Sequence, residues 1–139
     1  ASHSSVNPWR VKYVRGGLID VEFIAQYLQL LHAKDAHQIL TPGTTQALAN
    51  LGANSALTTI EEKTLVGAAI LYRNVQSFLR QCFQNDFNPD VAPLGLREAL
   101  AQATGADNFN ALKKQLVSTQ VAVLDLFKST ISDPAEKAK

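Results

Sequence analysis

Hydrophobic residues recur with helical spacing over five stretches of this chain. The first stretch covers residues 18–31, contains no glycine or proline, and is interrupted by one narrow polar stripe of Glu22, Gln26 and Gln29. A helix with so little polar surface normally packs on more than one side. We therefore predict that this is the central helix of the fold, buried against several neighbours.

The next two helices are marked by signals at their ends. Thr41 and Pro42 have the residue types of a helix start, and Gly52 is typical of the left-handed residue that ends one. Thr59 and Glu62 have the spacing of a capping box, in which each side chain bonds the other residue's backbone amide. The capping box predicts the start of the longest helix in the chain.

That longest helix is predicted over residues 60–84 and is followed by a loop containing two prolines. A short helix over residues 94–104 is expected to end at Gly105. The last helix is expected to have Asp107 or Asn108 as its N-cap, because its apolar positions then repeat with helical period.

The two ends of the chain differ from its middle. The opening residues are small and polar, and the alternation of Trp9, Val11 and Tyr13 with other residues predicts a short extended arm. The closing residues are charged and interrupted by proline. The whole pattern predicts an all-α fold, an antiparallel bundle of about five helices. We expect the chain to consist of a flexible lead-in over residues 1–8, a single helical domain over residues 9–131 and a frayed tail over residues 132–139.

Composition narrows the classes of function. The 139 residues are 46% hydrophobic, and 13 basic against 12 acidic residues give a net charge of +1. This balance argues against nucleic acid as a partner, because nucleic-acid binders carry a basic surplus. No apolar run has membrane length and no leader opens the chain, so we expect a cytoplasmic protein without a membrane partner. The absence of methionine suggests a piece of a longer protein.

Few residues belong to the types that perform catalysis or bind metals. Cys82 is the one cysteine, and its apolar neighbours in sequence predict a core residue rather than a nucleophile. His32 and His37 are five positions apart and do not share a helix face as a metal-binding pair would, so we expect solvated histidines. No glycine loop of the phosphate-binding kind occurs. We expect neither a catalytic nor a metal site in this chain.

The most suggestive cluster precedes the first helix. Gly16 and Gly17 allow close approach of the backbone, and Lys12 and Arg15 flank them with positive charge. Free amides at a helix start, together with two cations, suit an anion such as a phosphate. The same features suit a turn that docks against another domain, and the residues alone leave both interpretations open.

Asp20 and Glu22 are carboxylates at the start of the same helix. The helix macrodipole favours negative charge in a first turn, which is a sufficient structural reason for both residues. At this spacing on a helix the two side chains point about 200° apart. They therefore cannot chelate one metal ion together.

Residues 15–30 read RGGLIDVEFIAQYLQL. This run resembles the signature of the helical domain in the bacterial glutamine-synthetase adenylyltransferase family, whose pattern is near R-x-G-G-[IL]-x-[DE]-[IV]-E-F-[IL]-x-Q. Glycines, acids, phenylalanine and glutamine all fall in register. Residues 95–100 and the last helix, with Gln120, are also similar to the carboxyl end of that family.

The resemblance implies a parent enzyme with two nucleotidyltransferase halves, regulated by glutamine and a PII-type signal protein. One half attaches AMP from ATP to a tyrosine of glutamine synthetase, and the other removes it by phosphorolysis. Each half pairs a helical domain with a catalytic domain that carries a Gly-Ser motif and an Asp-x-Asp metal site, so the parent uses ATP and Mg²⁺.

The Gly-Ser and Asp-x-Asp pair does not occur in this sequence. We therefore expect a non-catalytic helical domain that binds no cofactor alone, and the charged tail suits the adenylylating, carboxyl-terminal half. The resemblance makes the residues of the first turn candidates for docking on the catalytic domain or for meeting the nucleotide. These candidates are Lys12, Arg15, Gly16, Gly17, Asp20 and Glu22.

Two alternatives stay open. The related PII uridylyltransferase shares the helical module, but it continues into a metal-dependent phosphohydrolase domain whose His-Asp ligands do not appear in this chain. A free-standing helical adapter, which binds partner proteins and performs no chemistry, would fit the same bundle.

Overall fold

The computed structural model describes residues 7–32, 43–82 and 88–134, and this part of the chain contains helices and no strand. The all-α prediction is confirmed. The α-helices of these described ranges are α1 (Leu18–His32), α2 (Thr44–Ala53), α3 (Thr59–Cys82), α4 (Leu94–Ala103) and α5 (Phe109–Phe127). A 3₁₀ turn, η3 (Pro89–Val91), precedes α4, and a π-helical turn, η4 (Lys128–Ser132), continues α5. None of the described helices is both long and apolar enough to cross a membrane.

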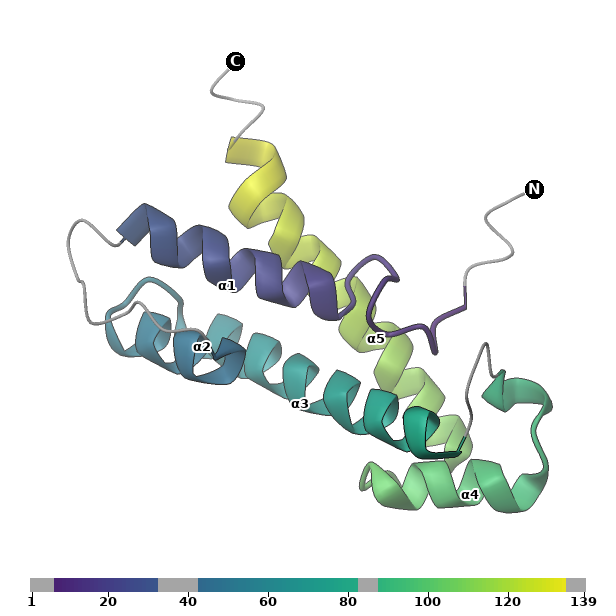
Figure 1. The fold of residues 1–139 in the computed structure, drawn as a ribbon. Helices are drawn as coiled ribbons and strands as arrows, with labels where there is room; N and C mark the ends of the chain where they lie inside the picture. The colour runs from purple at the N-terminus through teal and green to yellow at the C-terminus, as the bar shows by residue number, and fades with distance from the viewer. Residues whose placement is uncertain (1–6, 33–42, 83–87, 135–139) are drawn as a thin grey trace.

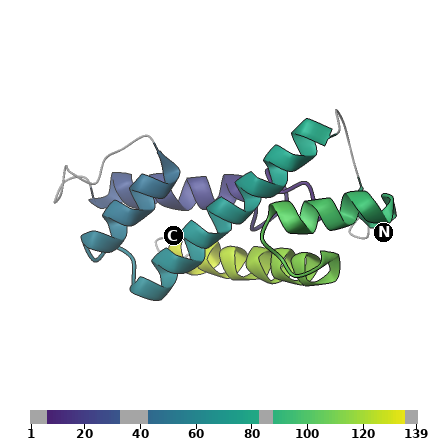
Figure 2. The same ribbon diagram turned by 90° about the horizontal axis from the view of Figure 1, so that it is seen from below.

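The helix at the centre of the fold is α3. It contacts α1, α2, α4 and α5, and it runs in the opposite direction to α1 and α5 in both views (Figure 1, Figure 2). Its buried side chains meet those of α5 in the main core, with Leu65, Tyr72, Leu112 and Leu116 fully buried. The prediction that residues 18–31 form the central helix is therefore wrong.

The segment before α1 is not the extended arm that its alternation predicts. Residues 7–17 form successive turns, in which the Tyr13 amide donates to the Arg10 carbonyl oxygen at 3.1 Å. Trp9 is buried and its ring stacks on Phe109 of α5, with 5.3 Å between the ring centroids. A lone strand has no partner for its backbone, whereas turns satisfy the backbone locally and bury the indole.

The capping box of α3 lies one residue earlier than predicted. The Thr58 hydroxyl accepts from the Glu61 amide at 3.1 Å, and the Thr58 amide donates to a carboxylate oxygen of Glu61 at 2.9 Å. The predicted partners, Thr59 and Glu62, offer the same residue types one position on. Glu62 instead lies against Gly52, where a Cβ atom would overlap its carboxylate. Gly52 thus permits this close approach and is not a left-handed residue.

The other helix ends are set by local side chains and backbone. The left-handed residue after α2 is Ser55, with φ of +62°. Gly105, with φ of +79°, follows α4 as predicted. Asn108, rather than Asp107, caps α5, because its side-chain oxygen accepts from the Ala111 amide at 2.8 Å.

Some predictions fall outside the described residues. These are the helix start at Thr41 and Pro42, His37, and most of the lead-in and tail. After η4, residues 133 and 134 continue as helix.

Candidate functional site

The turn that carries Gly16 and Gly17 is wedged against α5. Gly16 has φ of +78°, and a Cβ placed on it would overlap the carbonyl oxygen of Gln120 and lie 2.7 Å from its carbonyl carbon. A Cβ on Gly17 would lie 2.7 Å from the carbonyl oxygen of Val14. Only glycine fits these two positions without movement of the backbone. The glycine pair therefore allows the turn to close on α5.

Two long-range hydrogen bonds hold this turn in place. The Tyr72 hydroxyl donates to the Gly16 carbonyl oxygen at 2.6 Å in a buried setting, and the Gln120 amide nitrogen donates to the Pro8 carbonyl oxygen at 2.8 Å. Burial raises the pKa of Tyr72 well above its ordinary value, and the negative charge of Asp20 adds to this. Tyr72 is thus a neutral donor that joins α3 to the turn.

Sequence reasoning did not single out Tyr72 or Gln120 as part of this site. The available signal was a tyrosine and a glutamine on otherwise apolar helix stripes, since buried polar groups of this kind need hydrogen-bond partners. The identity of those partners, 56 and 112 positions away in the chain, could not be read from the sequence.

The backbone amides of the turn are already bonded within the chain. The Gly16 amide donates to a carboxylate oxygen of Asp20 at 2.6 Å, and the Gly17 amide donates to the Val14 carbonyl oxygen at 2.8 Å. The amides of the next two residues donate to the carbonyl oxygens of residues 11 and 12 at 2.7 and 3.2 Å. A bound anion would find these donors occupied, so the geometry favours the docking turn.

The two cations of the cluster remain on the surface. The Arg15 guanidinium lies 5.3 Å from the ring centroid of Phe127, and its Nε is 3.3 Å from the Asp20 carboxylate. The Lys12 ammonium lies 5.4 Å from the ring centroid of Tyr13. Both side chains are exposed, so both charges are accessible to another domain.

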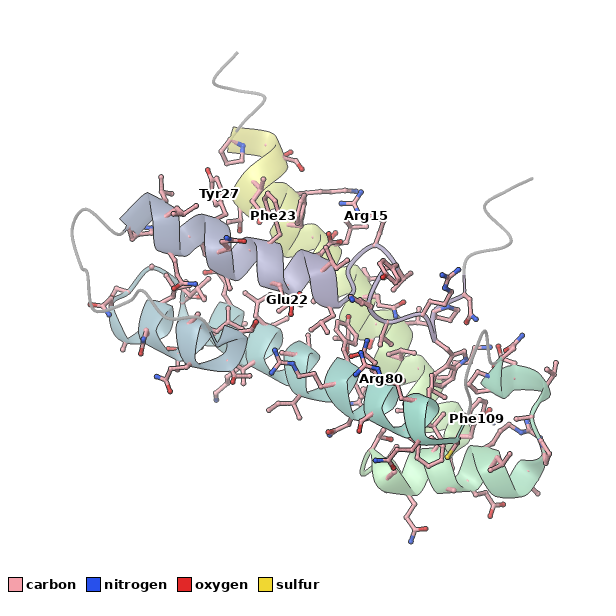
Figure 3. The ribbon with its side chains drawn as sticks, in the orientation of Figure 1. Arg15, Glu22, Phe23, Tyr27, Arg80 and Phe109 are labelled. Carbon is pink, nitrogen blue, oxygen red and sulfur yellow. The ribbon has the colours of Figure 1, made fainter. Side chains whose placement is uncertain are left out.

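Asp20 and Glu22 point apart. Asp20 turns back to the Gly16 amide and to Arg15, and it therefore acts within the turn. Glu22 faces Arg73 of α3, with 4.0 Å between the charged atoms and both side chains half-exposed. Figure 3 shows Glu22 on the side of α1 that faces α3. A surface ion pair of this length contributes little to stability, and Glu22 remains accessible.

The outer face of α1 is apolar and exposed. We define this outer face by Ile19, Phe23, Leu30 and Leu31, of which Phe23 is 50% and Leu30 is 69% exposed. The Phe23 ring meets that of Phe127 at the end of α5, with 5.9 Å between centroids, and Figure 3 shows Phe23 on the side of α1 near that end. The helix is apolar nearly all round, as predicted, and α2, α3 and α5 contact it, but these neighbours leave much of its outer face exposed.

The remaining candidates differ in their surroundings. Cys82 is exposed, so the prediction of a core residue is wrong. It is the last residue of α3. His32 is half-buried at the end of α1. Over the described ranges, no three His, Cys, Asp or Glu side chains gather as metal ligands would.

Comparison with protein families covers nearly the whole chain. The model of the family described as GlnD PII-uridylyltransferase matches residues 3–131. The chain belongs to this family. The helical bundle described above is thus a helical domain of the GlnD PII-uridylyltransferase family.

Curated relatives of this chain are named bifunctional glutamine synthetase adenylyltransferase/adenylyl-removing enzyme. One from Rhodopseudomonas palustris (strain TIE-1) is 39% identical over 123 residues, which make up 88% of this chain and 12% of the relative. One from Bradyrhizobium diazoefficiens is 37% identical with the same coverage. One from Xanthobacter autotrophicus is 34% identical over 128 residues, 92% of this chain and 13% of the relative. No solved structure matches.

These names confirm the resemblance carried by residues 15–30. The family model bears the name of the uridylyltransferase, which was the first alternative, whereas these relatives bear the name of the adenylyltransferase. The chain spans 12–13% of the length of the relatives it matches.

Proposed function

We propose that this chain is the non-catalytic helical domain of the adenylylating half of a glutamine-synthetase adenylyltransferase. In the parent protein, a nucleotidyltransferase domain transfers AMP from ATP to a tyrosine of glutamine synthetase in the cytoplasm, with Mg²⁺ and under control of a PII-type signal protein. The helical domain alone binds neither ATP nor metal. The names of the relatives and the lack of the Gly-Ser and Asp-x-Asp motifs support this proposal.

The outer face of α1 is the observation that carries the docking role. Contiguous exposed apolar surface commonly marks a site of protein contact, and α1 places such a surface directly after the glycine turn. In the proposed assembly, this face packs against the catalytic domain. Lys12 and Arg15 meet acidic groups or nucleotide phosphates there, and Glu22 accepts from a donor on that domain. The conformation of the turn itself depends on Gly16, Gly17 and Asp20, whose contacts are within the chain.

The test uses the full-length parent enzyme with Phe23→Ser. Loss of a ring from the centre of an interface is expected to slow transfer of radiolabelled AMP to glutamine synthetase by about tenfold or more. The matched control is Ile60→Ser, which removes a 78% exposed apolar side chain from the start of α3. In the isolated 139-residue chain, Ile60→Ser should melt as the wild type does, and Phe23→Ser should melt only slightly lower, because its half-exposed ring loses the contact with Phe127. Wild-type AMP transfer by Phe23→Ser would contradict the docking role.

The charged residues of the site are tested separately. Both Arg15→Gln and Glu22→Gln remove a charge; the second keeps the size of the side chain, and the first shortens it. Each is expected to slow AMP transfer in the parent enzyme while changing the melting temperature of the domain little, since the two side chains that are replaced are themselves exposed. Unchanged AMP transfer in both variants would return these residues to a purely local role.

The second candidate is the helical domain of a PII uridylyltransferase, which the description of the matching family favours. The same parent preparation discriminates between the two. Transfer of UMP to a PII-type protein, without transfer of AMP to glutamine synthetase, would replace the first proposal by the second.

A further inference from the structure

A second apolar surface runs along α5, away from the core. Val117 and Val121 are 42% and 56% exposed, while other positions of the same helix are buried. Two hollows lie over these valines and share Val117. One, of about 590 Å³, is lined by Lys113 and Lys114, and the other, of about 430 Å³, separates Val121 from the turn of residues 13–15. We call this surface the α5 trough.

The dimensions of the α5 trough suit a helix. Its lining positions on α5 run from Asn110 to Leu124, a length of about 21 Å at the helical rise per residue. Asn110, Val117, Val121 and Leu124 recur at helical spacing, so they form one straight stripe. The turn of residues 13–15 stands beside this stripe as a wall (Figure 1). A second helix of about 14 residues can therefore lie along α5, as amphipathic helices do in apolar grooves.

The rim of the α5 trough is positively charged. Lys113 is paired with Asp90 at 3.0 Å, and Arg15 with Asp20. Lys114 forms no ion pair with a carboxylate in the described part of the chain. No carboxylate is among the described residues that line the two hollows. Within α5, the one acidic side chain is Asp125, which lies beyond the last lining position. The surplus of cations favours an acidic occupant.

We propose that the α5 trough binds an amphipathic helix of a partner protein whose apolar stripe is flanked by acidic side chains. The valines receive the apolar stripe, and Lys114 meets a carboxylate. The α5 trough contains none of the outer-face residues of α1, and it shares one residue, Arg15, with the docking proposed above. Val121 and Lys114 belong to the trough alone, so variants of these two residues test this proposal separately from the docking role.

The test uses the chain itself and a defined probe. The probe is a fluorescein-labelled peptide of about 14 residues, with leucines at helical spacing flanked by glutamates. A second peptide has lysine in place of each glutamate. Fluorescence anisotropy is expected to show binding of the acidic peptide at least about tenfold tighter than that of the basic one. Equal binding of the two peptides, or no binding of either, would overturn the proposal.

Substitutions in the chain test whether the peptide binds at the α5 trough. Val121→Asp is expected to weaken binding of the acidic peptide by about tenfold or more, and Lys114→Glu by about threefold, with the latter difference shrinking as salt is added. The matched control is Leu30→Asp, the same added charge on the outer face of α1, which is expected to leave binding unchanged. Wild-type affinity of Val121→Asp, or an equal loss in Leu30→Asp, would overturn the proposal.

Discussion

Replacement of Gly16 by alanine tests the packing of the turn most sharply. The new Cβ would overlap the Gln120 carbonyl oxygen, and the residue would need φ of +78°. The neighbouring backbone belongs to α5 and cannot rotate away as a side chain can. The turn must therefore move off the helix, which breaks the hydrogen bond from Tyr72.

Gly16→Ala is expected to lower the free energy of unfolding for two main reasons. Holding an L-residue in the left-handed region costs about 1–2 kcal/mol. Leaving the buried Tyr72 hydroxyl without its acceptor costs about 1–3 kcal/mol. Together they lower the free energy of unfolding by about 2–5 kcal/mol, a large share of the roughly 5–15 kcal/mol that stabilises a typical domain.

Urea denaturation followed by circular dichroism measures this loss. Gly105→Ala is the matched control, because Gly105 has nearly the same φ, +79°, and a Cβ there would meet nothing within 4 Å. It is expected to lose only the conformational part, about 1–2 kcal/mol. Tyr72→Phe should destabilise the wild-type chain but add little to Gly16→Ala, since the hydrogen bond is then already lost. Equal losses in the Gly16 and Gly105 variants would refute the reasoning.

Three further predictions concern single side chains. The raised pKa of Tyr72 in the folded chain means that the unfolded state releases this proton first, so its contribution to stability is present below about pH 10 and falls as pH rises further. The free energy of unfolding should drop more between about pH 9 and pH 11 in the wild type than in Tyr72→Phe, and equal drops would contradict the assignment. Asn108→Ala removes the cap of α5 and should cost about 1 kcal/mol in urea denaturation, whereas Asn110→Ala, in the first turn of the same helix, should cost less. Cys82 should react with Ellman's reagent in the native chain at nearly the rate seen in denaturant, and strong protection would place it back in the core.

Helices were predictable here because their signals are local. Asn108 caps α5 through an amide three residues on, and Gly105 ends α4 by its own conformation. The predicted capping box of α3 was one residue too late in the sequence. The reason is that Thr58 is followed by a second threonine and Glu61 by a second glutamate, so both pairs have the same spacing. Local patterns therefore identify an element and leave its first residue ambiguous.

Predictions of burial, which depend on tertiary contacts, were less accurate than predictions of helix ends. An apolar circumference predicts burial of α1 on several sides, yet α2, α3 and α5 leave its outer face exposed, because the arrangement of neighbouring helices is a property of the whole fold. The exposure of Cys82 has the same cause, because apolar neighbours in sequence do not determine whether other helices cover a residue.

At the candidate site, composition pointed to the correct turn but not to its contacts. Glycines at positions 16 and 17 indicated close approach of another group. That this group is the backbone at Gln120, and that the amides of the turn are satisfied by the chain, depended on packing between segments more than 100 residues apart.

The central claim is that the outer face of α1 is covered by another domain in the parent protein. Hydroxyl-radical footprinting measures this directly, by comparing the oxidation rate of Phe23 in the 139-residue chain with that in the full-length parent enzyme. Ile60, which is more exposed than Phe23 and lies on α3, serves as the reference. The account predicts that Phe23 oxidises much more slowly in the parent while Ile60 oxidises at the same rate in both. Equal rates for Phe23 in the two proteins would contradict it.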